Sequence, residues 1–121
     1  MEWKFSGTEP VFLQLADVLR LQILRGEYAS GEQIPTVRQL ATEAAVNPNT
    51  VQRALVVLEE EGLVYASGTQ GRFVTQDAAL LSAAAARVRR RTVKRFLERA
   101  GAIGLDGAQI IEIIKEEMQG E

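Results

Sequence analysis

Residues 36–62 read TVRQLATEAAVNPNTVQRALVVLEEEG and contain two signals for the start of a helix. Thr36 followed three residues later by Gln39 is a capping box, in which each side chain accepts a hydrogen bond from the other residue's backbone N–H. Asn47 followed by Pro48 is a second start, because asparagine is a favoured N-cap and proline fits the first helical position. These signals predict two helices joined by a turn of about three residues.

The ends and buried faces of these two helices can also be predicted. The first should end at about Glu43 or Ala44. The second should end at Gly62, after which Leu63 can fold back onto Leu58 in a Schellman stop. The apolar stripe of the second helix is Val51, Ala54, Leu55 and Leu58. Two short helices with such a turn have the pattern of a helix-turn-helix.

The start of the second helix has side chains suited to reading DNA bases. A recognition helix enters the major groove by its N-terminal end, where Asn and Gln can pair with adenine and Arg with guanine or phosphate. No acid lies between Val46 and Leu58, and the acidic run Glu59 to Glu61 is at the far end. The candidate contacts are Asn47, Asn49, Thr50, Gln52 and Arg53. The alternative is an ordinary helix with a solvated acidic end.

The flanking segments complete a small domain. A first helix is predicted from about Pro10, placed in its first turn, to Arg25. Two short strands, 63–66 and 72–75, enclose a glycine-bounded hairpin tip. This hairpin is a candidate wing along the minor groove, although alone it would be read only as a turn. Further DNA-binding candidates are Thr36 and Arg38 at the start of the second helix, and Thr69, Gln70, Gly71 and Arg72 in the wing.

After Asp77 the sequence predicts a helical tail. A long helix should reach about Ala100, broken by Gly101 and Gly104, and a second capping box, Asp106 with Gln109, opens a last helix. That helix is apolar on more than one side, which burial against a second subunit would explain. The alternative is that it folds back onto its own long helix. Candidate dimerisation residues are Leu81, Val88, Phe96, Ile110, Ile111 and Ile114.

Charge alone does not identify a nucleic-acid binder. The chain has 121 residues and a net charge of −2, with six basic and nine acidic side chains in 1–76 and eight basic and seven acidic in 77–121. The basic side chains of the long tail helix could form a solvated face, contact phosphates, or contact the acids of a partner subunit. These residues are Arg87, Arg89, Arg90, Arg91, Lys94, Arg95 and Arg99.

Composition excludes several kinds of chemistry. Cysteine and histidine are absent, which removes disulfides, thiol nucleophiles, imidazole catalysis and the usual zinc and haem ligands. No acid pair or phosphate-binding glycine loop is recognisable. We therefore expect no enzyme activity and no cofactor. The apolar run 78–86 is interrupted by Ser82 and is too short to span a bilayer, so a cytoplasmic protein without membrane contact is expected.

Residues Pro10 to Val74 resemble the DNA-binding domain of the GntR family of bacterial regulators. The matching runs are Pro10 to Leu15, Leu24 to Tyr28, Gly31 to Ala41, Val46 to Ala54, Leu58 to Val64 and Gly71 to Val74. The Val46 to Val51 stretch and the short tail resemble the YtrA-type subfamily. The resemblance implies a winged helix-turn-helix domain in residues 1–76, DNA contacts from the helix-turn-helix and wing candidates named above, and a homodimer on an inverted-repeat operator.

The expected fold is therefore mainly α with a small β-hairpin wing, followed by a two-helix dimerisation tail in residues 77–121. Many relatives carry a further basic residue at the wing tip, and this chain departs from that pattern with Thr69 and Gln70, which lack a charge for minor-groove contact. Larger members carry ligand-binding domains, whereas this tail can hardly enclose a pocket. A small-molecule effector would be of unknown identity.

The function expected is a dimeric repressor that binds double-stranded operator DNA. The rival is a winged-helix module that binds protein.

Overall fold

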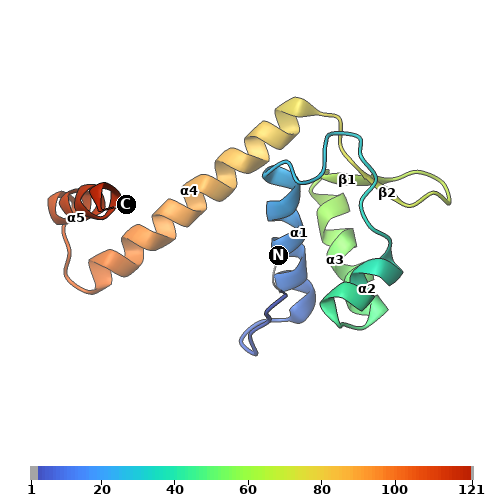
Figure 1. The fold of residues 1–121 in the computed structure, drawn as a ribbon, viewed down its shortest axis with the longest axis horizontal. Coiled ribbons are helices and arrows are strands. Elements are labelled where there is room, and N and C mark those ends of the chain that lie inside the picture. The colour runs from blue at the N-terminus through green and yellow to red at the C-terminus, as the bar shows by residue number, and fades with distance from the viewer. Residues whose placement is uncertain (1–2, 121) are drawn as a thin grey trace. The chain divides into compact units, whose positions relative to one another are not determined.

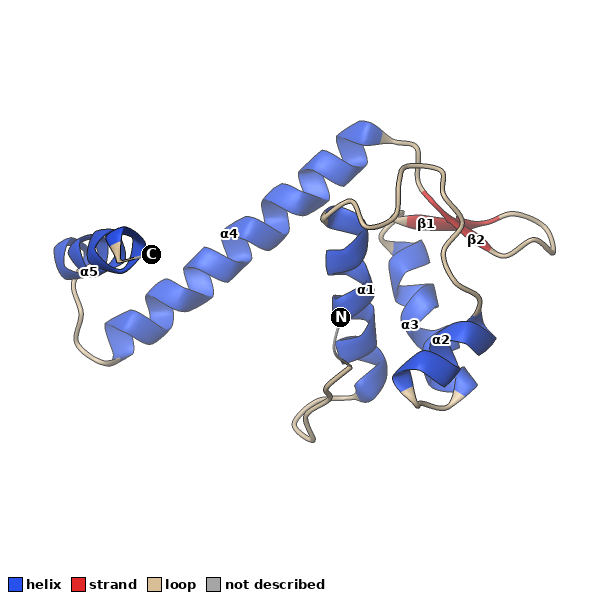
Figure 2. Cartoon of the chain, viewed as in Figure 1, coloured by secondary structure: helices blue, strands red, loops and turns tan. Residues whose placement is uncertain are grey.

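The computed structural model describes residues 3–120, which form five helices and a two-stranded sheet (Figures 1 and 2). The elements are α1 (Val11–Leu24), α2 (Val37–Ala44), α3 (Pro48–Glu60), β1 (Val64–Ala66), β2 (Arg72–Val74), α4 (Ala78–Ala102) and α5 (Gly107–Gln119). The chain divides into two compact units, the first ending at Ala84 and the second beginning at Ala85. This confirms a mainly helical fold with a small hairpin.

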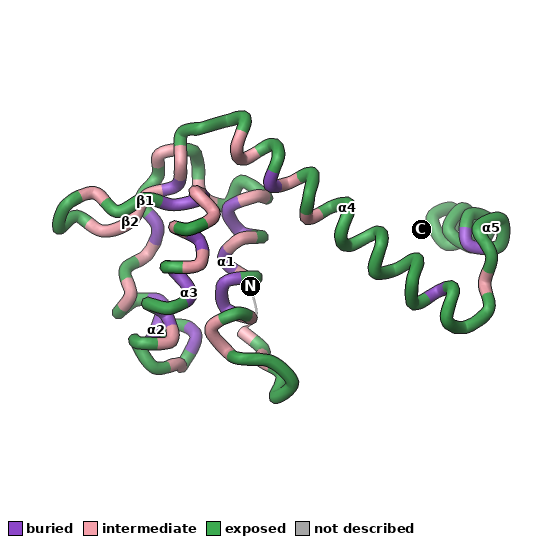
Figure 3. The backbone as a smooth tube through the Cα atoms, turned by 180° about the vertical axis from the view of Figure 1, so that it is seen from behind, coloured by how far each residue is buried: buried purple, intermediate pink, exposed green. Residues whose placement is uncertain are grey.

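The core of the first unit lies among α1, α2 and α3. Leu15 and Leu19 of α1, Leu40 of α2 and Leu55 and Leu58 of α3 are fully buried in one cluster. The buried positions of α1 and α3 recur at helical spacing, so that each helix turns one apolar stripe inward (Figure 3). Burying a leucine side chain contributes about 2 kcal/mol, so these residues fix how the three helices pack.

Both predicted helix starts are confirmed. The hydroxyl of Thr36 accepts from the Gln39 N–H at 3.1 Å, and the Gln39 side chain accepts from the Thr36 N–H at 2.8 Å. The Asn47 carboxamide accepts from the Asn49 N–H at 2.7 Å, with Pro48 at the first helical position. A three-residue turn separates α2 from α3, and its first residue, Ala45, takes the left-handed conformation at φ 55°.

The end of α3 is also as predicted. The N–H of Leu63 donates to the Leu58 carbonyl at 3.0 Å, and the N–H of Gly62 donates to the Glu59 carbonyl at 3.0 Å. These are the two bonds of a Schellman stop, and Gly62 lies at φ 79°, a conformation that glycine adopts without strain.

Two details of the predicted helices were wrong. Pro10 caps α1 instead of lying within it, because its backbone is extended at ψ 137° while its carbonyl accepts the first helical bonds. Gly101 does not break α4, which continues to Ala102. One glycine in a helix costs only about 1 kcal/mol, which the good helix formers before it can offset. The chain takes a left-handed conformation only later, at Gly104.

The hairpin pairs β1 and β2 in antiparallel register, with Tyr65 opposite Phe73. The connection between α1 and α2, predicted as a turn-rich loop, adds a third extended piece, because Gln33 bridges to Phe73. The Ile34 N–H donates to the Arg72 carbonyl at 2.9 Å. Ile34 is buried, so this connection anchors the base of the wing to the core.

The first turns of α4 belong to the first unit. Leu80 and Leu81 pack against its core cluster, and Ala84 is buried within it. A methyl group added at Gly62 would approach Leu80 to 2.9 Å, which shows how closely Leu80 covers the end of α3. The first turns of α4 therefore pack as part of the first compact unit, which ends at Ala84.

The second unit buries little of its own apolar surface. It consists of the rest of α4 and all of α5, which opens with the predicted capping box of Asp106 and Gln109. Among its described residues, Ala100 and Ile110 are the buried ones, and the other side chains are exposed or half-buried. None of the described helices has the length and apolar character needed to cross a bilayer.

Candidate nucleic-acid interface

The exposed face of α3 is polar along its first two turns. Asn49, Gln52 and Arg53 are exposed, and Thr50 is half-buried. Asn47 is exposed at the cap, where its side-chain oxygen is used by the helix. The buried stripe of α3 packs on the core, so the polar face is directed away from it. Such a face offers donors and acceptors of the kind that read base edges in a major groove.

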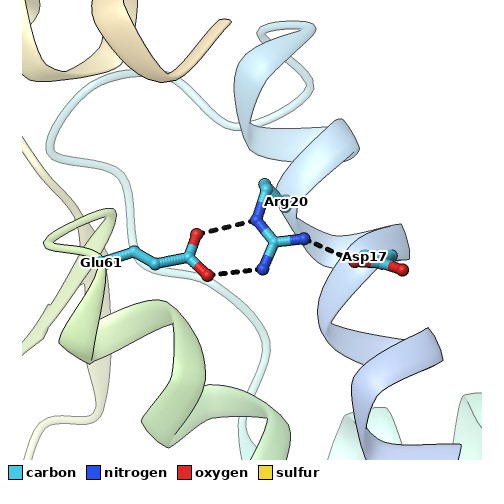
Figure 4. Close-up of polar contacts among 3 residues, drawn as sticks. All are labelled: Asp17, Arg20 and Glu61. Atoms are coloured by element: carbon cyan, nitrogen blue, oxygen red, sulfur yellow. Dashed lines mark hydrogen bonds and ion pairs between the residues drawn. The ribbon is translucent and has the colours of Figure 1, made fainter. Parts of the chain in front are cut away.

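Most arginines of the first unit are paired with carboxylates. Arg20 of α1 donates to both oxygens of Glu61, at 2.7 and 2.6 Å, and to Asp17 (Figure 4). Arg25 lies 3.8 Å from Glu27. These side chains therefore contribute little net positive charge to the surface.

Two arginines of the first unit have no carboxylate partner among the residues described, Arg38 and Arg53. Both are exposed, Arg38 in the first turn of α2 and Arg53 in the second turn of α3. The uncompensated arginine charge of this net acidic unit therefore lies on the helix-turn-helix. Backbone N–H groups at the starts of α2 and α3 add partial positive charge there.

Arg53 is held by an aromatic ring. Its guanidinium carbon lies 3.9 Å from the ring centroid of Phe12, in the first turn of α1. A guanidinium stacked on a ring keeps its N–H donors at the edge, where a phosphate or a base can accept them. Phe12 was not among the sequence candidates, because nothing in its local sequence indicates that it contacts α3.

The wing tip is exposed and supported from beneath. Thr69 and Gln70 are exposed, and the Gln33 side chain donates to the Gln70 carbonyl. Gly71 has φ 107°, and a methyl group there would lie 2.9 Å from the Gln33 nitrogen. Gly71 therefore shapes the tip through its backbone.

Arg72 differs from the other wing candidates. Its guanidinium pairs with Glu59 of α3, and its side chain is only 16% exposed. It joins the start of β2, next to the wing tip, to α3, and its charge is neutralised by Glu59. Glu59, read in the sequence only as part of an acidic helix end, thus positions the wing.

The tail candidates are in different environments. Leu81 is half-buried against the core of the first unit, and Val88 is half-buried. Ile110 is buried within its own unit, whereas Phe96, Ile111 and Ile114 are 46%, 56% and 39% exposed. Ile110 is the one buried residue of the described α5, so α5 buries little apolar surface within its own unit.

The sequence profile described as "Bacterial regulatory proteins, gntR family" matches residues 12–74, which span α1 to β2. The chain belongs to the GntR family. Over 99% of both chains it is 30% identical to the uncharacterized HTH-type transcriptional regulator YhcF of Bacillus subtilis. It is also 32% identical to the transcriptional repressor YtrA of the same organism, over 60% of this chain and 55% of YtrA.

Solved structures of GntR proteins agree with the fold. A GntR family regulator from Listeria monocytogenes superposes with a TM-score of 0.87 at 28% identity, covering 93% of this chain and 98% of that one. The DNA-binding domain of AraR in complex with its operator ORX1 superposes with a TM-score of 0.58 at 26% identity, covering 62% of this chain and 96% of that one. This GntR protein is therefore a DNA-binding transcriptional regulator with a winged helix, and the rival of a protein-binding module is not supported.

Proposed function

We propose that this GntR protein is a repressor that binds an inverted-repeat operator as a homodimer, with a DNA-reading domain followed by a dimerisation tail. One observation carries the proposal. The unpaired arginines of the first unit, Arg38 and Arg53, lie on the helix-turn-helix beside the acid-free start of α3. Base contacts are assigned to Asn49, Gln52 and Arg53, and phosphate or base contacts to Arg38.

Relatives support the repressor role. Similar chains include the repressor YtrA of Bacillus subtilis and the repressor MngR of Escherichia coli, which is 37% identical over 59% of this chain and 30% of its own length. A repressor acts by occupying DNA, and for that purpose a winged helix and a dimer are sufficient. A small-molecule effector remains a prediction.

The tail supports the dimer. Phe96, Ile111 and Ile114 leave large apolar side chains in water, and monomeric proteins rarely expose such groups together. A two-fold symmetric dimer interface would cover these side chains. It would also hold the two DNA-binding domains at half-sites about 34 Å apart, which is one turn of DNA. The tail is therefore proposed to set the spacing of the half-sites.

A titration with promoter DNA tests sequence-specific binding. DNA upstream of the protein's own gene is compared with a scrambled duplex of equal composition, at several salt concentrations. Affinity for the promoter should be higher and should fall about tenfold or more between low and moderate salt, since a few neutralised phosphates release their counterions. Equal affinity for both duplexes would contradict sequence-specific DNA binding by this protein.

Two variants test the assigned face. Arg38→Ala and Gln52→Ala should each weaken promoter binding by about 1–3 kcal/mol if they contact bases. Arg25→Ala is the matched control, because this exposed arginine is near Glu27 and outside the helix-turn-helix. Thermal unfolding shows whether each variant is folded. Unchanged affinity in both variants, with folding intact, would place the DNA contacts elsewhere.

Sedimentation tests the dimer. Replacing Ile111 and Ile114 by aspartate should give monomers, because a dimer interface would then bury unpaired charge. Ile110 is unsuitable for this purpose, since it is buried within its own unit. Leu21→Asp is the control, at 40% exposure against 39% for Ile114 but on α1. A wild-type chain that is monomeric at micromolar concentration would overturn the dimer.

A further inference from the structure

The middle of α4 carries a concentration of uncompensated positive charge. Residues 85–102 contain seven basic side chains and one acidic side chain, a net charge of +6, and all of these side chains are exposed. Among the described residues, no ion pair joins any of the seven to a carboxylate. Like charges four residues apart repel, as Arg87, Arg91 and Arg95 do in succession, so this charge destabilises the helix. It is therefore available to an anionic partner.

Most of these charges lie on one side of the helix. At 3.6 residues per turn, five of the basic side chains fall within one half of its circumference, which we call the basic face. The basic face consists of Arg87, Arg90, Arg91, Lys94 and Arg95. Glu98 lies at its C-terminal end and offsets one of the five charges. The exposed Val93, Phe96 and Leu97 fall on the opposite half, so a partner on the basic face would leave them free for the proposed dimer.

Double-stranded DNA is the polyanion that this chain already binds. The first unit offers it few cations, since residues 1–76 have a net charge of −3 and, among the described residues, only the arginines Arg38 and Arg53 lack a carboxylate partner. Helix α4 follows β2 after a connection of three residues, and Arg87 comes one helical turn after Ala84, which is buried in the core of the first unit. When the winged helix binds DNA, the basic face is thus tethered to the same duplex at a high effective concentration.

We propose that the basic face of α4 is a second DNA-contacting surface, which binds phosphates outside the half-site and adds affinity without sequence preference. From Arg87 to Arg95 the face extends about 12 Å at 1.5 Å per residue. A duplex carries one phosphate charge per about 1.7 Å, so that length of DNA offers more phosphates than the face has cations. This inference rests on the proposed operator binding and gives the basic residues of the tail a role.

Neutralising two arginines at the centre of the basic face tests the proposal. Arg87→Gln with Arg91→Gln keeps residues that favour a helix and removes a like-charge pair, so the full-length variant should fold. Its affinities for promoter DNA and for a scrambled duplex should fall by the same factor, about tenfold or more at about 0.1 M salt. The slope of log affinity against log salt concentration should become shallower by about 2 per chain, because each lost phosphate contact removes about one.

The matched control is Arg25→Gln with Lys115→Gln, which removes the same charge from exposed positions outside the basic face. Its DNA affinity and salt slope should stay near those of the wild type, which separates a local contact from the net charge of the chain. Arg87→Lys with Arg91→Lys should also bind as the wild type does, because lysine keeps the charge that a phosphate attracts. Sedimentation and far-UV circular dichroism show whether each variant keeps the association state and helix content of the wild type.

The possible outcomes separate this inference from the proposed function. Unchanged affinity and salt slope in the Gln variant, with the promoter still preferred, would overturn the second surface and leave operator binding in place. A Gln variant that no longer prefers the promoter would assign these arginines to base reading, and one that falls apart into monomers would assign them to the dimer. Either result overturns the inference.

Two further outcomes concern the partner. Vesicles of equal parts phosphatidylcholine and phosphatidylglycerol provide an anionic surface without DNA. If the Gln variant loses binding to these vesicles while its DNA affinity is unchanged, the basic face belongs to a membrane and the inference is overturned. If the wild type binds promoter and scrambled DNA equally, the proposed function fails, whereas a lower affinity and shallower salt slope in the Gln variant still support the basic face.

Discussion

At the scale of single residues, Phe12 controls the orientation of Arg53. The ring of Phe12 lies under the guanidinium, with 3.9 Å between the guanidinium carbon and the ring centroid. Phe12→Leu should weaken promoter binding about two- to fivefold, the equivalent of one exposed cation–π contact, whereas Phe12→Tyr should bind normally. The measurement is a DNA titration in the wild-type and Arg53→Ala backgrounds. If Phe12→Leu weakens binding equally in both backgrounds, Phe12 does not act through Arg53.

Arg20 of α1 contributes to the α1–α3 packing through its ion pair with Glu61 at the end of α3. The hydrogen bond to Glu61 raises the pKa of Arg20, although burial opposes the shift. The stability that this shift contributes is present below the ordinary pKa of arginine and is lost only as the pH rises through the raised pKa. Arg20→Ala should lower the free energy of unfolding by about 2 kcal/mol, since the side chain is 14% exposed and makes a two-bond pair. Asp17→Asn, at a carboxylate 60% exposed, should cost less than about 0.5 kcal/mol. Urea unfolding of both variants measures the difference, and equal losses would contradict it.

At the scale of elements, the wing depends on one glycine. Gly71 has φ 107°, outside the regions open to other residues, and faces the Gln33 side chain. Gly71→Ala should destabilise the hairpin and reduce promoter affinity if the wing contacts DNA. Gly68→Ala is the matched control, because its φ of 54° is left-handed helical and no atom lies within 4 Å of an added methyl. Gly71→Ala should cost about 1–2 kcal/mol more in thermal unfolding. Equal effects of the two substitutions would show that the tip relaxes freely.

At the scale of the whole molecule, the place of truncation determines what is lost. A chain ending at Thr75 lacks Leu80, Leu81 and Ala84, which pack on the core of the first unit, whereas a chain ending at Ala86 keeps them. Both should be monomers with weak promoter affinity, since linking two readers raises their effective concentration. The longer form should be more stable by about 2–4 kcal/mol, because it retains two leucines on the core. Sedimentation, thermal unfolding and a DNA titration distinguish the forms. A dimeric truncated chain would assign dimerisation to the first unit.

The helices and their ends could be predicted from sequence because the interactions that define them are local. The caps at Thr36, Asn47 and Asp106 each join atoms two or three residues apart, and the stop at Gly62 joins atoms within five residues. The residue types alone specify such contacts. The acid-free start of α3, visible in the sequence, similarly identified the candidate reading face.

Only the tertiary structure decided which charges are available to a partner. The sequence presents Arg38, Arg53 and Arg72 as equivalent candidates, yet Arg72 is neutralised by Glu59, thirteen residues away. Arg20 pairs with Glu61 over a separation of 41 residues. These partners meet because α1, α3 and the hairpin share a core, and no local pattern encodes such a meeting. The same holds for the tail. The sequence shows four isoleucines in α5 but not which of them are buried, and only the packing of the helix leaves Ile110 buried and Ile111 exposed.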